Sequence, residues 1–188
     1  MVTLIFYGLF ILLLLLGLLW ILVPALYGLP SIPTRPDRIR KALKLANLQP
    51  NEILYDLGAG DGRVLRIAAR EFGARGVGIE IDPMHCAFTW LIALASGLGD
   101  QVQIRWQNFY KADLSEADIV FFYGTSKETA RLGPKLAREL KQGARVAAIS
   151  ADFPNWQPSA FDYEGLIFIY RMPPIKGDLA SYLLEKEK

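Results

Sequence analysis

The chain has 188 residues, enough for one domain. Its 21 Lys and Arg residues nearly balance 19 Asp and Glu residues, and the net charge of +2 argues against binding to nucleic acid through bulk charge. A hydrophobic content of 52% excludes a disordered chain. A single cysteine, Cys86, rules out an intrachain disulfide, and with a single histidine it leaves no basis for a zinc site. We therefore expect no nucleic-acid partner and no metal.

The beginning of the chain differs from the rest. The first charged side chain is that of Arg35, and residues 2–29 are almost entirely apolar. About 20 apolar residues span a bilayer as a helix, whereas a cleaved signal peptide has a basic start and a shorter apolar core. We therefore expect a retained transmembrane anchor at 1–29. The basic residues that follow, by the positive-inside rule, predict a single-pass protein whose remaining part faces the cytoplasm or the mitochondrial matrix. They are Arg35, Arg38, Arg40, Lys41 and Lys44.

Three prolines in residues 30–36 predict a stiff, extended linker. A short amphipathic helix is expected over 37–47. Strands and helices then alternate with short connections, which predicts an α/β domain at 37–175 with a Rossmann-like, doubly wound, mostly parallel sheet, followed by a C-terminal tail at 176–188. The expected strands are 53–57, 76–81, 102–106, 119–123, 145–149 and 166–171, and the expected helices between them are 63–72, 83–98 and 127–141.

The most informative segment is a glycine loop at the end of the first expected strand. Gly58, Gly60 and Gly62 form G-x-G-x-G, which lets the backbone approach a ligand closely. A carboxylate at Asp56, just before the loop, would repel a pyrophosphate but would attract an ammonium group. Glu80, at the end of the next strand, is where a carboxylate holds both ribose hydroxyls. The alternative is a tight turn with solvent-facing acids. The two acids favour a nucleoside cofactor, S-adenosylmethionine rather than NAD.

These segments resemble class I S-adenosylmethionine-dependent methyltransferases. More narrowly, the chain is similar to the small, membrane-anchored protein-lysine methyltransferases of the ATP synthase c-subunit and the adenine nucleotide translocase. The resemblance rests on the apolar start, L-P-S-I-P-T-R-P, Y-D-L-G-A-G-D-G-R-V, G-V-G-I-E-I-D-P and F-P-N-W-Q-P. It implies a membrane-protein lysine as substrate. Two positions depart from the family: Asn108 stands where an acid usually meets the adenine amino group, and Tyr123-Gly124-Thr125-Ser126 replaces a pattern nearer Y-L-L-P.

Methyl transfer to lysine requires a neutral amine, and a narrow, partly apolar channel lowers the amine pKa by desolvation. Tyr123 and Trp156 are the candidates for shaping such a channel, although either could be ordinary core. His85 and Cys86 are expected to lie away from the transferred methyl group. Two other functions stay open: a methyltransferase for a lipid or small apolar molecule at the membrane, and an inactive cofactor-binding module that serves as an interaction partner.

The expected helix over 83–98 contains no Asp, Glu, Lys or Arg. Its apolar residues occur all round the helix, whereas a helix of this fold normally shows water a polar face. We expect its outer face, with Trp90 and Leu94, to meet the bilayer, the anchor helix or another subunit. The alternative is that the N-terminal segment of the domain covers it.

Overall fold

The computed structural model describes residues 2–27 and 33–186. The chain divides into two compact units, Met1–Pro33 and Thr34–Lys188. The first unit holds α1, a helix over Val2–Tyr27 without a charged residue. The last two residues of the expected anchor and residues 30–32 of the expected linker lie outside the described residues. Among the side chains that the structure describes, which in α1 omit positions 2, 4, 16 and 19–27, no helix is long and apolar enough to cross a membrane.

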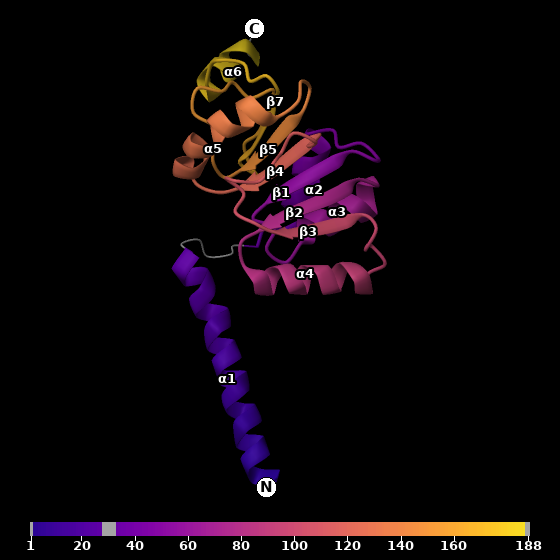
Figure 1. Cartoon of the computed structure of the whole chain (residues 1–188). Helices are drawn as coiled ribbons and strands as arrows, with labels where there is room; N and C mark the ends of the chain where they lie inside the picture. The colour runs from indigo at the N-terminus through magenta and orange to yellow at the C-terminus, as the bar shows by residue number, and fades with distance from the viewer. Residues whose placement is uncertain (1, 28–32, 187–188) are drawn as a thin grey trace. The chain divides into compact units, whose positions relative to one another are not determined.

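The second unit is built on a seven-stranded mixed sheet (Figure 1), whose strand order is β3-β2-β1-β4-β5-β7-β6. The first five strands are parallel, and β7 and β6 are antiparallel additions at one edge. The strands are β1 (Ile53–Leu57), β2 (Arg75–Glu80), β3 (Val102–Trp106), β4 (Ile119–Tyr123), β5 (Arg145–Ile149), β6 (Ala160–Asp162) and β7 (Ile167–Arg171).

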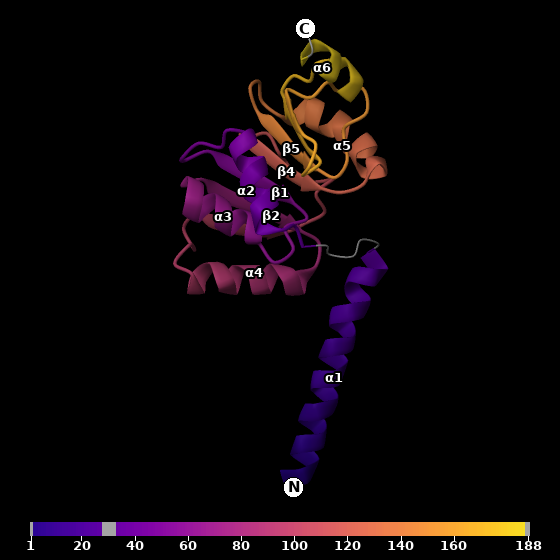
Figure 2. The same ribbon diagram turned by 180° about the vertical axis from the view of Figure 1, so that it is seen from behind.

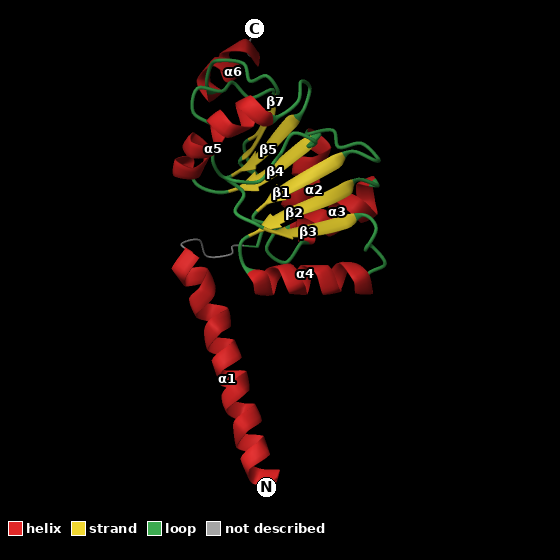
Figure 3. Ribbon diagram, in the orientation of Figure 1, coloured by secondary structure: helices red, strands yellow, loops and turns green. Residues whose placement is uncertain are grey.

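Helices cover both faces of this sheet, as Figures 2 and 3 show from opposite sides. On one face lie α2 (Pro36–Leu45) and α3 (Arg63–Phe72), and on the other lies α5 (Ser126–Glu139). A hydrophobic core lies on each face of the sheet, and alternate residues of β4 point into one or the other. Phe121 packs in the core on the α2 and α3 side, and Phe122 packs in the core on the α5 side. This two-sided burial explains why the central strands read as continuous apolar runs.

The structure confirms the Rossmann-like arrangement and corrects several boundaries. α2 begins at Pro36, one residue inside the expected linker, because proline is favoured in the first helical turn, where its missing N–H costs nothing. α4 (Pro83–Ala95) stops three residues earlier than expected, and Gly97 then adopts a left-handed conformation with φ of 68°. Two short elements were not predicted, β6 and a helix α6 (Leu179–Lys186) within the segment expected to be the C-terminal tail.

α4 lies along β3, and it buries only small or medium side chains against the sheet: Cys86, Thr89 and Ala93. Its large apolar side chains face outward instead. Trp90 and Leu94 are 53% and 48% exposed. The helix therefore keeps an apolar outer surface among the described residues, as the sequence predicts, and the small inner residues explain how it can do so.

Candidate active site

The glycine loop connects β1 to α3 at the carboxyl edge of the parallel strands. Gly58, Gly60 and Gly62 all have positive φ, which L side chains rarely adopt. At Gly62 a Cβ atom would lie 2.4 Å from Cγ2 of Thr89 on α4. The Thr89 hydroxyl donates to the Gly60 carbonyl at 2.8 Å. The loop is therefore held tightly against α4, with backbone shapes that require glycine.

Glu80 joins the loop after β1 to the loop after β2. Its buried carboxylate accepts the Gly60 amide at 2.8 Å through Oε2. Oε1 accepts the amides of Ile81 and Asp82, at 2.8 and 3.0 Å. A carboxylate has about four acceptor positions, so one more hydroxyl donor can still be accommodated. Glu80 thus shapes the loop and keeps one acceptor position for a polar ligand.

Asp56 is a buried carboxyl at the same edge, 4% exposed. Burial, followed by the charges of Glu80 and Asp61, raises the pKa of Asp56 to about 8. Asp61 is paired with Arg63, whose Nη2 lies 2.7 Å from Oδ2. The Asp56 and Glu80 side chains thus form a site that favours a cationic group, because a positive charge would offset the cost of ionising Asp56 beside Glu80.

Asn108 follows β3 and is half-buried. Its Oδ1 accepts the Tyr110 amide at 2.9 Å, so part of the acceptor capacity expected for adenine is used in a local turn. Trp106 was not predicted from the sequence as part of this region. Its indole Nε1 donates to the Ile81 carbonyl at 2.8 Å, which ties the end of β3 to the loop after β2. The ring is 71% exposed beside these loops.

The two aromatic candidates for an acceptor channel lie against opposite sides of the sheet. Tyr123 ends β4 and packs with the core beneath α2 and α3, whereas Trp156 packs with the core beneath α5. Trp156 stacks on Phe153 with ring centres 4.7 Å apart and meets Tyr170 edge-on at 5.6 Å. No contact within the described residues joins the two candidates. Trp156 is therefore well explained as packing, and its role toward an acceptor stays a prediction.

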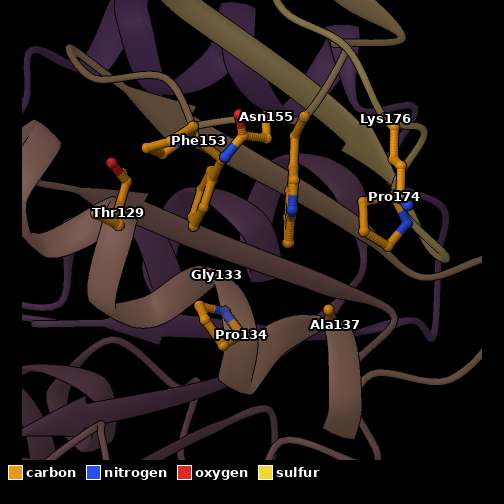
Figure 4. Close-up of a pocket in the computed structure, with 11 residues that line it drawn as sticks. Thr129, Gly133, Pro134, Ala137, Phe153, Asn155, Pro174 and Lys176 are labelled. Carbon is orange, nitrogen blue, oxygen red and sulfur yellow. The ribbon is translucent and has the colours of Figure 1, made fainter.

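Trp156 also borders a cavity of about 470 Å³ beside α5, shown in Figure 4. Phe153 points toward Gly133 of α5, where a Cβ atom would lie 3.3 Å from the ring. Pro174 and Lys176 close the other side. The lining is mostly apolar, so this cavity suits an apolar segment better than a nucleoside.

His85 and Cys86 lie at the start of α4. His85 Nδ1 is 2.9 Å from Oδ2 of Asp82, the residue that caps this helix. Burial, followed by Glu80 and Asp82, raises the pKa of the Cys86 thiol to about 11. A thiol held neutral in this way is a poor nucleophile. Among the described residues no group of three or more His, Cys, Asp or Glu side chains could hold a metal ion.

The positive-φ glycines, the buried acids and the strand edge fit a nucleoside with a cationic tail. With the Rossmann-like sheet they define the class: the protein is an S-adenosylmethionine-dependent methyltransferase. Residues 56–160, more than half of the chain, match the family described as the ANTKMT methyltransferase domain. The chain belongs to this family of protein-lysine methyltransferases.

Two curated relatives illustrate the similarity. A protein-lysine N-methyltransferase of Saccharolobus islandicus (strain REY15A) is 33% identical over 130 residues, which cover 69% of this chain and 81% of the relative. The Homo sapiens enzyme that methylates a lysine of the ATP synthase c-subunit is 30% identical over 151 residues, covering 79% of this chain and 64% of the relative. The chain thus spans slightly less than two thirds of the human relative.

Among solved structures, an RNA methyltransferase from Salinibacter ruber in complex with S-adenosyl-L-homocysteine superimposes with a TM-score of 0.74. It is 37% identical, and the match covers 79% of this chain and 99% of that one. An S-adenosylmethionine-dependent methyltransferase from Geobacter sulfurreducens, also with S-adenosyl-L-homocysteine, has a TM-score of 0.52 and 25% identity, over 63% of this chain and 50% of that one. These likenesses bear out the cofactor predicted from Asp56 and Glu80.

Proposed function

We propose that the protein is a membrane-anchored enzyme that methylates a lysine of a membrane protein. The observation that carries lysine as the acceptor is the 33% identity to the Saccharolobus protein-lysine N-methyltransferase over most of that relative. The c-subunit and translocase relatives support a membrane-protein substrate, since their names specify proteins of that kind. The proposal of a membrane-protein substrate and a membrane anchor combines these names with the apolar start of the chain.

Asp56 and Glu80 are the proposed cofactor-binding acids. Asp56 would accept the ammonium group of the methionine part, and Glu80 would accept one ribose hydroxyl at its remaining acceptor position. Gly58, Gly60 and Gly62 would let the backbone approach the cofactor closely. Asn108 would accept from the adenine amino group with its remaining oxygen lone pair. When bound, the cofactor supplies an electrophilic methyl group on its sulfonium. The acid pair therefore orients the cofactor by charge as well as by shape.

The side chains around the acceptor site would act by positioning the lysine amine. The acceptor amine must lose its proton before it can attack, and desolvation favours the neutral form without a strong base. Tyr123, half-buried at the end of β4, is the proposed wall of this acceptor site. Trp156 is the second candidate, and the cavity beside it would receive an apolar stretch of the substrate rather than the reacting amine.

Membrane attachment is proposed from the sequence. The uncharged run before Arg35 supports an anchor. The basic residues after it support a position on the cytoplasmic or matrix side for the second unit, Thr34–Lys188, which we call the catalytic unit. Alkaline extraction of membranes and protease digestion of a C-terminal tag in sealed vesicles of known orientation test both points. We expect the chain to resist extraction and the tag to be cut only from the cytoplasmic or matrix side. Release by alkali would refute the anchor.

The Salinibacter likeness favours a second acceptor, RNA, because that structure is described as an RNA methyltransferase. The near-neutral chain weighs against it. Incubation with methyl-labelled cofactor and whole membranes, followed by separation of protein, lipid and RNA, distinguishes the acceptors. We expect label in protein. Label confined to lipid or RNA would replace lysine as the acceptor, and no incorporation anywhere would favour the inactive binding module.

A further inference from the structure

A pocket of about 230 Å³ between α2 and α3 is lined by four arginine side chains. Arg40 comes from α2, and Arg63, Arg66 and Arg70 come from α3. The three on α3 are spaced by three and four positions, so they share one face of that helix. Glu71 is the one carboxylate in the lining. The pocket is thus a compact concentration of guanidinium groups. It adjoins the glycine loop, because Arg63 pairs with Asp61 and Arg66 Nη1 donates to the Asp61 carbonyl.

Only two of these four positive charges are balanced. Arg40 pairs with Glu71 through two nitrogens, with Nη2 2.7 Å from Oε1 and Nε 2.7 Å from Oε2. Arg63 pairs with Asp61. The described residues provide no carboxylate ion pair for Arg66 or Arg70. Four arginines against two carboxylates leave an excess of two positive charges at this place.

This excess is unfavourable for the folded chain on its own. Burial lowers the pKa of the Arg66 guanidinium, and the neighbouring charges of Arg63 and Arg70 lower it further against the opposing effect of Asp61. Like charges three and four positions apart also weaken a helix. An anion bound between the guanidinium groups would relieve both penalties, since arginine forms paired, charge-assisted hydrogen bonds with phosphate oxygens.

The place of the pocket in the chain indicates the source of the anion. Pro36 lines the pocket, and Arg63 Nη1 donates to the carbonyl of Thr34, the first residue of the second unit, at 3.2 Å. Thr34 follows Tyr27, the last residue of α1, by only seven positions in the sequence. If α1 is embedded, the chain enters the catalytic unit beside this pocket.

We propose that the four-arginine pocket binds a phosphate group and that the headgroup of an anionic phospholipid supplies it. The lipid source rests on the membrane attachment proposed above, whereas the phosphate site rests on the charges alone. A lipid fits better than RNA because RNA binding engages a track of several phosphates, and this excess is confined to one small pocket. The site would fix the catalytic unit against the membrane surface.

The test uses the full chain in micelles of an uncharged detergent. Native mass spectrometry measures binding of phosphatidylglycerol, phosphatidylcholine, inorganic phosphate and a short RNA. The pocket variant carries Arg66→Gln and Arg70→Gln. The control carries Arg75→Gln and Lys127→Gln, which remove the same two charges from exposed positions outside the pocket. Arg70→Gln alone is a milder variant, because that exposed side chain makes no ion pair within the described residues. Circular dichroism establishes that each variant is folded.

We expect phosphatidylglycerol to bind the wild type and the control in preference to phosphatidylcholine, and the pocket variant to bind it roughly tenfold more weakly. Equal retention by the pocket variant and the control would overturn the site. Pocket-dependent binding of inorganic phosphate or RNA, without lipid, would overturn the lipid source. Alkaline extraction of the same protein separates failure of the proposed anchor from failure of the phosphate site. If alkali releases the chain from membranes but phosphate binding still depends on the pocket, the anchor is refuted and the phosphate site stands.

Discussion

The guanidinium of Arg38 lies over the ring of Tyr123, with Cζ 5.6 Å from the ring centre. Arg38 belongs to α2, the first helix of the catalytic unit, and Tyr123 ends β4 at the edge where the acceptor is proposed to lie. The same guanidinium donates to the Ser150 hydroxyl at 2.9 Å and to the Gly165 carbonyl. One side chain from α2 therefore holds together the carboxyl ends of β4 and β5 and the turn between β6 and β7.

Replacing Arg38 with alanine is expected to slow methyl transfer while leaving cofactor affinity nearly unchanged. Displacement of a group that positions an acceptor costs roughly ten- to a hundredfold in rate. Arg38→Lys should recover only part of it, because an ammonium cannot cover the ring and reach both oxygens. Single-turnover rates and calorimetric affinities make the comparison, with the highly exposed Arg35→Ala as control. A rate in Arg38→Ala equal to that of the control would contradict the positioning role.

Cofactor affinity should depend on the two acids. Asp56→Ala removes the partner of a cationic group, and Glu80→Ala removes both the ribose acceptor and the bond to the Gly60 amide. Losing a hydrogen bond to a charged group costs about 1.5–3 kcal/mol, or roughly ten- to a hundredfold in affinity. Calorimetry with S-adenosylmethionine measures this against Glu116→Ala, an exposed acid. Unchanged affinity in both variants would remove these residues from the site.

The stability of the cofactor-free protein should carry the signature of Asp56. Its pKa is raised to about 8 in the folded state, above the ordinary value near 4. Between these values the folded state binds more protons than the unfolded state, so the free energy of unfolding falls as pH rises toward about 8. Asp56→Asn should therefore stabilise the protein, and the gain should grow from pH 5 to pH 8. Urea titrations at both pH values, with Asp100→Asn as control, check the sign. A gain that does not grow with pH would contradict a protonated Asp56.

The sequence predicts the glycine loop and its acids because they lie at the ends of buried strands, where an apolar run followed by G-x-G-x-G leaves few alternatives. The ranges of β1, β4 and β5 agree with the prediction because these strands are also buried. The range of β3 agrees as well, although only its first residue is buried. β6 has three residues, too few for a pattern to emerge. Arg38 was predicted only as a basic flanking residue, since its contact with Ser150 joins positions 112 apart. Contacts of that range depend on the assembled sheet and leave no local signal.

The outer face of α4 provides a test of substrate approach. Trp90→Lys with Leu94→Lys places two charges on exposed apolar positions that do not touch the sheet core. We expect this variant to methylate a membrane-embedded substrate more slowly while binding the cofactor normally, because an apolar surface of this size usually meets a partner or a bilayer. Leu183→Lys with Leu184→Lys makes the same change at exposed apolar positions on α6. Equal rates for the two variants would assign the α4 surface no part in substrate approach.

The central claim is tested most directly by amino-acid analysis of the labelled product. The full chain is incubated with methyl-labelled S-adenosylmethionine and membranes, and the membrane protein is hydrolysed completely. Our account predicts that the label is recovered as methylated lysine. Below cofactor saturation, Asp56→Ala and Glu80→Ala should each lower the yield in proportion to the cofactor affinity that the variant has lost. Label recovered in another amino acid, or in lipid or RNA with none in lysine, would contradict it.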